Sequence, residues 1–163
     1  GGPPQRRPRG PVPEERLLDL GPRPAEADVW SALGLEIKLK RLDQRSIMRW
    51  VSALVKAKRP HAAAALLRVA QTFGGQLTPK HYGATIGACG KAGQWFEAVR
   101  LLREMAGARV ERNVIMYGTA IKACKKDGQW PAALQLLEDV ARAAVERNGL
   151  LYSSAMTACR QAG

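Results

Sequence analysis

A block of sequence that recurs at a fixed interval restricts the fold of this chain more than any other feature. Four residue types return every 35 residues, at Tyr82, Tyr117 and Tyr152, at Ala88, Ala123 and Ala158, at Cys89, Cys124 and Cys159, and at Gly93, Gly128 and Gly163. A period of roughly 20 to 50 residues is typical of repeat proteins, in which each unit buries its apolar face against its neighbours. The chain is therefore predicted to be an array of such units.

Each unit is predicted to contain two antiparallel helices. Tyr82, Ile86 and Cys89 are spaced as on one helical face, Gly93 can end that helix, and a second apolar series with helical spacing begins at Trp95. Equivalent core positions should therefore be buried in both clear copies. They are Tyr82, Ile86, Cys89, Leu101 and Leu102 in one copy, and Tyr117, Ile121, Cys124, Leu136 and Leu137 in the next.

The period divides most of the chain into copies of differing quality. Residues 79–113 and 114–148 are the clear copies. Residues 43–78 form a degenerate copy, in which Lys58 replaces the turn glycine and Pro60 replaces the tryptophan. The predicted fold is all-α, an α-solenoid of stacked antiparallel helical hairpins.

The two ends of the chain depart from this pattern. Residues 149–163 supply only the first helix of a further copy, so the chain is interpreted as part of a longer protein. Residues 25–42 are predicted to form a capping helix, weakened at Gly34, because a stack of hairpins leaves an apolar face at its end. Residues 1–24 hold seven of the ten prolines, which predicts an extended Pro/Arg-rich arm with few contacts.

The composition predicts a soluble protein that binds polyanions. Lys and Arg number 26 against 14 Asp and Glu, a net charge of +12, which favours nucleic acid as a ligand. There is no apolar run of the roughly 18 residues that a membrane span needs. Three cysteines and two histidines without a CxxC pair give no zinc site, and no catalytic constellation is visible. We therefore expect no enzyme activity, metal, cofactor or small-molecule substrate.

The repeat resembles the pentatricopeptide repeat (PPR) family. The resemblance rests on HYGATIGACGKAGQWFEAVRLLREMAGARVERN and MYGTAIKACKKDGQWPAALQLLEDVARAAVERN, in which the tyrosine, the Lys-x-Gly turn and the Ala and Leu positions of the second helix match that family. It implies a concave surface of first helices that binds single-stranded RNA at about one base per repeat. It also implies an organellar protein, in a mitochondrion or chloroplast.

The resemblance implies particular contact residues. Positions that read the base correspond to Gly83 with Asn113, Gly118 with Asn148, and Ser153, and positions that flank the base correspond to Lys80, Ile115 and Leu150. The two glycines replace the family's usual Thr, Ser or Asn. Lys91 and Lys126 correspond to its phosphate contacts.

The positive charges near the end of the first helix support a phosphate-binding stripe independently. Lys122, Lys125 and Lys126 share one helix, and Arg160 and Lys91 are one period away from two of them, so stacked hairpins would align them. Lysine at a helix C-terminus is also explained by the helix dipole alone.

Two further alternatives stay open at this stage. The chain could be a structural subunit of a large organellar assembly, such as a ribosome, that uses the repeat for protein contacts. The substitutions at Gly83 and Gly118 favour that alternative. Trp95 and Trp130 could stack on bases, but their place at the start of the second helix favours the hairpin core.

Overall fold

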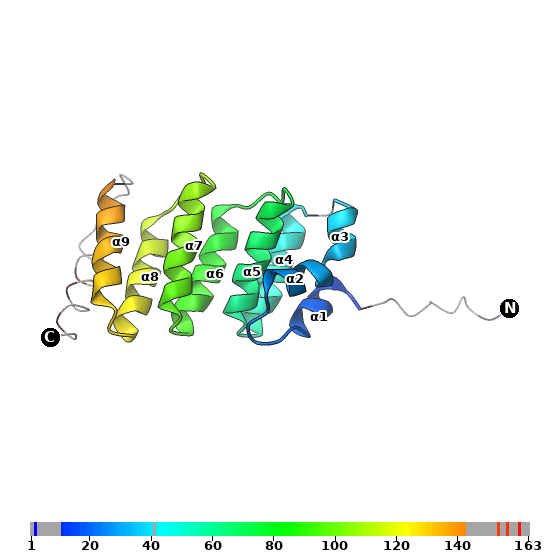
Figure 1. Ribbon diagram of the computed structural model, residues 1–163, viewed down its shortest axis with the longest axis horizontal. Helices are drawn as coiled ribbons and strands as arrows, with labels where there is room; N and C mark the ends of the chain where they lie inside the picture. The colour runs from blue at the N-terminus through cyan, green and yellow to red at the C-terminus, as the bar shows by residue number, and fades with distance from the viewer. Residues whose placement is uncertain are drawn as a thin grey trace.

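The computed structural model describes residues 11–40 and 42–142, together with Gly2, Ser153, Met156 and Arg160. Within these residues the chain forms nine α-helices and no strand, as the predicted all-α class requires (Figure 1). None of these helices combines the length and apolar character needed to cross a membrane.

Six helices of 13 residues each make up most of the fold, and their bounds repeat with the 35-residue period of the sequence. The first helices of the pairs are α4 (Gln44–Lys56), α6 (Pro79–Lys91) and α8 (Val114–Lys126). The second helices are α5 (Pro60–Thr72), α7 (Trp95–Gly107) and α9 (Trp130–Arg142). The segment 43–78 therefore has the same helix bounds as the two clear copies, although its sequence matches them poorly.

Capping residues explain where the first helices begin. Asp43, Thr78 and Asn113 precede α4, α6 and α8 and all have extended backbone, as N-caps do. The Asp43 carboxylate accepts a hydrogen bond from the backbone N–H of Ser46 at 2.8 Å, and the Asn113 side-chain oxygen accepts one from Met116 at 3.0 Å. Thr78 makes no such side-chain bond, and its own N–H donates to Nδ1 of His81 at 2.9 Å. Side-chain capping therefore helps to set the start of α4 and of α8.

The turns inside the hairpins share one backbone conformation. Lys58, Gly93 and Gly128 follow the first helices at the same register position and have φ of 58°, 72° and 64°. Glycine adopts this left-handed region without the steric cost that other residues incur. Lys58 makes the turn without that advantage.

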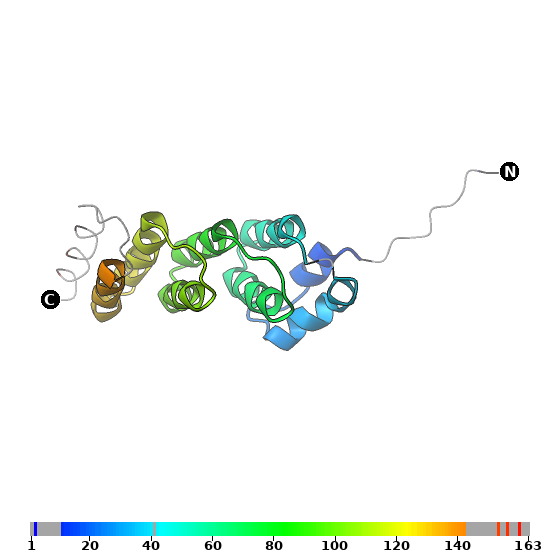
Figure 2. The same cartoon turned by 90° about the horizontal axis from the view of Figure 1, so that it is seen from above.

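The helices lie in two layers. Each first helix packs against its own second helix, and α4, α6 and α8 also pack directly on one another. We call α4, α6 and α8 the first-helix layer and α5, α7 and α9 the second-helix layer; Figure 2 shows the two layers from above. This arrangement is consistent with a helical repeat.

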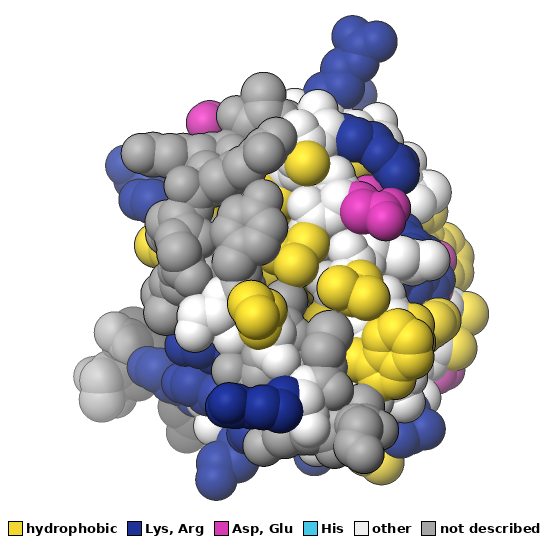
Figure 3. Space-filling model, turned by 90° about the vertical axis from the view of Figure 1, so that its left-hand side faces the viewer, with side chains coloured by type: hydrophobic (Ala, Val, Ile, Leu, Met, Phe, Trp, Pro, Cys, Tyr) yellow, Lys and Arg dark blue, Asp and Glu magenta, His cyan; other side chains and the backbone are white. Residues whose placement is uncertain are grey.

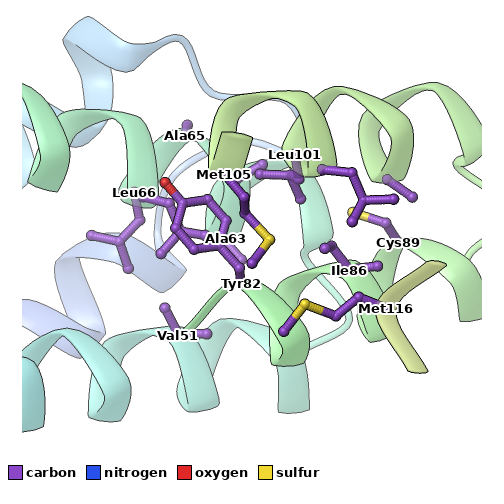
Figure 4. Close-up of a cluster of buried hydrophobic side chains, with 14 of the residues drawn as sticks. Val51, Ala63, Ala65, Leu66, Tyr82, Ile86, Cys89, Leu101, Met105 and Met116 are labelled. Carbon is purple, nitrogen blue, oxygen red and sulfur yellow. The ribbon is translucent and has the colours of Figure 1, made fainter. Parts of the chain in front are cut away.

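The core lies between the layers. Figure 4 shows Tyr82 and Ile86 of α6 packed among side chains of α5 and α7. Nine of the ten predicted core residues are buried, and Leu137, on α9, is only partly buried. The equivalent cysteines Cys89 and Cys124 are both buried and free, as the register predicts.

The predicted extended arm is wrong for residues 13–18. They form α1 (Pro13–Leu18), which packs against α4 and buries Leu17. Pro13 occupies the first turn, where the missing N–H costs nothing, so the proline that argued against a helix begins one. Arg16 adds an ion pair with Glu36 at 2.6 Å.

The predicted capping helix over residues 25–42 is divided. It forms α2 (Glu26–Ala32) and α3 (Gly34–Lys38), with the break at Leu33, next to the glycine expected to weaken it. α2 packs against α5 while α1 packs against α4, so a short pair of helices covers this end of both layers.

Candidate nucleic-acid interface

Charge is distributed unequally between the two layers. The first-helix layer carries eight basic residues, Arg45, Arg49, Lys56, Lys80, Lys91, Lys122, Lys125 and Lys126, and no Asp or Glu within its three helices. The second-helix layer carries four arginines, Arg68, Arg100, Arg103 and Arg142, and four acids, Glu97, Glu104, Glu138 and Asp139. The helices of the first layer thus contribute a charge of +8 and those of the second contribute none.

Three lysines form a row at one end of the first-helix layer. Lys56, Lys91 and Lys126 are the last residues of α4, α6 and α8, and all three are exposed. The phosphate assignment included Lys91 and Lys126 but missed Lys56, although Lys56 is one period before Lys91. Stacking places the three helix ends side by side. The helix dipole explains a lysine at the end of one helix, but it does not require a lysine at the same position in three successive helices.

A groove lies beside this row, between the end of α4 and α6. Its volume is about 660 Å³. Gly83, Gly87 and Lys91 of α6 line it, together with Lys56 and Lys58. Because the glycines have no side chains, the groove is open along α6 and has three ammonium groups around it.

The positions implied to read the base fall into two groups. Gly83 and Gly118 are half-buried on the first-helix layer, and Gly83 lines the groove. Asn113 is exposed, and its side-chain oxygen accepts the hydrogen bond that caps α8, while its amide NH₂ can donate to a ligand. Asn148 lies outside the described residues, and Ser153 is exposed.

The flanking positions are exposed where they are described. Lys80 is exposed at the start of α6, and Ile115, one period later, is 74% exposed at the start of α8. Arg45 occupies the same register position on α4, which sequence reasoning did not single out. Leu150 lies outside the described residues.

The other basic residues assigned to phosphate contact differ in their exposure to solvent. Lys122 and Arg160 are exposed, whereas Lys125 is half-buried.

The two tryptophans differ, although they share a register position. Trp95 is partly buried against the core, but Trp130 is 43% exposed, so its assignment to the hairpin core is wrong. α7, which begins at Trp95, packs on α8 of the next hairpin, while α9 belongs to the last described pair. Apolar side chains are visible at this end of the molecule in Figure 3.

The cysteines and the buried histidine are held by burial and by hydrogen bonds within the fold. Burial raises the pKa of Cys89 to about 12 and that of Cys124 to about 11, so neither thiol is a reactive thiolate. His81 accepts a hydrogen bond from the Thr78 N–H at Nδ1, and its Nε2 donates to the Gln44 carbonyl, both at 2.9 Å. The described residues contain no cluster of three or more His, Cys, Asp or Glu able to hold a metal ion.

Comparison with known families agrees with this geometry. The family model described as PPR repeat matches residues 80–110 and 115–143, which correspond to the α6–α7 and α8–α9 hairpins. No curated protein matches the chain. The molecule is a helical-repeat protein, and it carries two pentatricopeptide repeats, as its sequence predicted.

Proposed function

We propose that this protein binds single-stranded RNA along its first-helix layer, acting in an organelle as PPR proteins typically do. The observation that carries the proposal is the separation of charge between the layers, eight basic residues and no acid on α4, α6 and α8. A phosphate chain laid on this face meets no acidic side chain of these helices.

The 43–78 hairpin belongs to the same binding surface in this proposal. Its helices keep the register of the two matched repeats, and Lys56 extends the row formed by Lys91 and Lys126. Three successive hairpins then offer phosphate contacts, which corresponds to about three bases.

Binding at these repeats depends more on charge than on base identity. Gly83 and Gly118 supply no side-chain donor or acceptor where the family has one, so Asn113 alone carries a hydrogen-bonding side chain in the first implied base-reading pair. In this proposal the groove beside Gly83 holds a base without a hydrogen bond from position 83 to the base edge. We therefore infer weak sequence preference and strong salt dependence.

The test is a salt titration of RNA binding for three single variants, Lys56→Ala, Lys91→Ala and Lys126→Ala. Each should weaken binding of U-rich and A-rich 12-nucleotide RNAs equally and lower the slope of log K against log salt by about 0.7 to 1. Arg142→Gln is the matched control, because it removes one exposed charge from the second-helix layer.

Two results would contradict the proposal. If Arg142→Gln lowers the salt slope as much as the lysine variants do, the binding surface is not the first-helix layer. If the parent protein shows no salt-dependent RNA binding, the structural-subunit alternative takes the place of the RNA proposal.

A further inference from the structure

The second-helix layer has an open pocket between α7 and α9 that the proposed RNA function does not use. Its volume is about 410 Å³. Its polar lining consists of Arg103, Arg112, Gln135, Glu138, Asp139 and Arg142.

One repeat earlier, between α5 and α7, the equivalent arginine is held in an ion-pair network, beside a smaller pocket of about 230 Å³ that Arg68, Glu97 and Arg100 help to line. Arg68 pairs with Glu97, and its Nε donates to Glu104 at 2.8 Å. Arg100 forms an ion pair with the same carboxylate at 3.3 Å. The Arg68 side chain is only 15% exposed. Buried charges of this kind are tolerated because each arginine has a carboxylate partner.

A shift of 35 residues shows what the open pocket lacks. Arg103 takes the place of Arg68 and Asp139 that of Glu104, but Ala132 takes the place of Glu97. Within the described residues Arg103 has no carboxylate within ion-pair distance, and it donates a hydrogen bond to the neutral side chain of Gln135, at 3.3 Å.

The other charges at the pocket do not replace the missing carboxylate. Glu138 and Asp139 both pair with Arg142, at 3.3 and 4.0 Å. The Arg112 guanidinium lies 5.7 Å from the centre of the Tyr117 ring and has no acidic partner in the described part of the chain. Two arginines at this pocket therefore lack a carboxylate.

We propose that this pocket binds a glutamate or aspartate side chain from an acidic segment of a protein partner. The bound carboxylate takes the position beside Arg103 that Glu97 holds beside Arg68. A single carboxylate fits between the arginines, whereas an RNA strand brings a charge with every nucleotide and would meet Glu138 and Asp139 at the rim. The site is independent of the RNA surface on the opposite layer.

The test uses an acidic peptide, acetyl-Gly-Glu-Gly-Glu-Gly-amide, and its glutamine counterpart, observed through the arginine Nε–H NMR signals of the full chain. The signals of Arg103 and Arg112 should shift saturably with the glutamate peptide and not with the glutamine peptide. Arg103→Gln should weaken the peptide's effect on Arg112 by about threefold to fivefold, the range of a single exposed ion pair. Lys126→Gln, with the same charge removed from the first-helix layer, should leave these shifts unchanged.

A second variant tests the register argument directly. Ala132→Glu restores the carboxylate found at Glu97, at the third position of α9, where an acidic residue also suits the helix N-terminus. The Arg103 signal should move without peptide, and the peptide should no longer bind there. RNA should bind Ala132→Glu as well as it binds the parent.

Three outcomes would overturn the inference. Equal weakening by Lys126→Gln and Arg103→Gln would show non-specific attraction to a basic protein. Peptide binding that survives Ala132→Glu would place the peptide elsewhere. Displacement of the peptide from Arg103 by an oligonucleotide of uridine would assign the pocket to RNA.

Discussion

Lys58 and Gly93 occupy the same turn of successive hairpins, 35 residues apart, and both have left-handed backbone, with φ of 58° and 72°. The strain falls only on the lysine, because its Cβ crowds the following carbonyl oxygen. Lys58 also lines the groove beside Gly83, so its charge and its backbone conformation have opposite expected effects.

Lys58→Gly should therefore stabilise the fold and weaken RNA binding. The expected gain in the free energy of unfolding is about 0.5 to 1 kcal/mol, the strain relieved less the entropy that glycine loses on folding. Lys58→Ala is the matched control, because it removes the same charge and keeps the Cβ. It should weaken RNA binding equally without the gain in stability. Chemical denaturation and RNA titration of both variants measure the two effects, and equal stability of the two would contradict the strain argument.

The sequence was sufficient for the repeated part of the fold. A 35-residue period with turn glycines at 93 and 128 predicted where two hairpins turn, and the helix bounds around Lys58 follow the same register. The bounds persist there because capping by Asp43 and packing on α6 outweigh one strained turn.

The N-terminal segment was less predictable, because the proline content of residues 1–24 as a whole does not show where each proline lies in a helix. Pro13 is compatible with a helix only as a first-turn residue, and Leu17 stabilises α1 only because the surface of α4 is there to bury it. Neither fact is visible in local composition. The exposure of Trp130 has a similar cause, since burial depends on what packs against a residue as well as on its register.

The sequence period supplies one part of the candidate site, and helix packing supplies the other. The period aligns Lys91 with Lys126, and asparagine is a favoured N-cap residue type at 113. The groove, in contrast, depends on how the end of α4 packs beside α6. The pocket at Arg103 follows from the loss of a partner at Ala132, which only a comparison of two packed interfaces shows.

Asn113 allows capping to be separated from base contact. Asn113→Ala should cost about 1 kcal/mol of unfolding free energy, because the N–H of Met116 loses its acceptor. Asn113→Asp keeps that acceptor and removes the amide NH₂, so it should leave stability near that of the parent. Both variants should lose any base preference shown by the parent. A loss of base preference in Asn113→Ala alone would mean that the amide acts only through the helix cap.

Two glycines on α6 should respond in opposite directions to the same substitution. A Cβ at Gly90 would lie 2.9 Å from Cγ2 of Thr119 on α8, so Gly90→Ala must displace either the Thr119 side chain or the two helices. It should destabilise the fold by about 1 to 3 kcal/mol. Gly87→Ala meets nothing within 4 Å and should stabilise by up to about 1 kcal/mol through helix propensity. Thermal unfolding of the pair measures this contrast, and equal shifts would contradict the close approach of α6 and α8.

The buried cysteines predict slow thiol chemistry. In a Cys159→Ser background, burial that raises the pKa of Cys89 to about 12 and of Cys124 to about 11 leaves little thiolate at pH 8. Reaction with a disulfide reagent should be about a hundredfold or more slower in the folded protein than in denaturant. Rapid reaction of either thiol in the folded protein would contradict the packing of that hairpin.

The same shifts predict how stability depends on pH. A pKa that is higher in the folded state means that the folded protein holds the proton more tightly than the unfolded chain does. The stability that the protonated thiols contribute is therefore complete below the unfolded pKa of about 8.5. It is lost as pH rises toward 11 to 12. Burial raises the pKa of Tyr82 and Tyr117 in the same direction, so both residue types contribute. A Cys89→Ala, Cys124→Ala variant should lose less stability between pH 8 and pH 10 than the parent, measured by denaturant titration.

Gly83 offers a gain of function that tests the proposed mode of RNA binding. The PPR family reads a base through Thr, Ser or Asn at this position, and Gly83 supplies no such group to the groove that it lines. A Cβ at Gly83 would meet only the terminal methyl of Met116, at 3.3 Å, and that flexible side chain can move. Gly83→Ser should therefore fold normally and place a hydroxyl in the groove, within the same repeat that ends at Asn113.

The expected result is new base discrimination of about 1 to 3 kcal/mol at one nucleotide position, by analogy with hydrogen-bonded base readout on DNA. The salt slope should stay that of the parent, because a hydroxyl adds no charge and releases no counterion. Gly83→Ala is the matched control, since it fills the same space without a hydrogen-bonding group and should bind all sequences alike. Binding of a panel of RNAs that differ at a single position measures the effect. If Gly83→Ser discriminates no better than Gly83→Ala, the bases do not reach this groove, and the RNA contacts of this layer are made by charge alone.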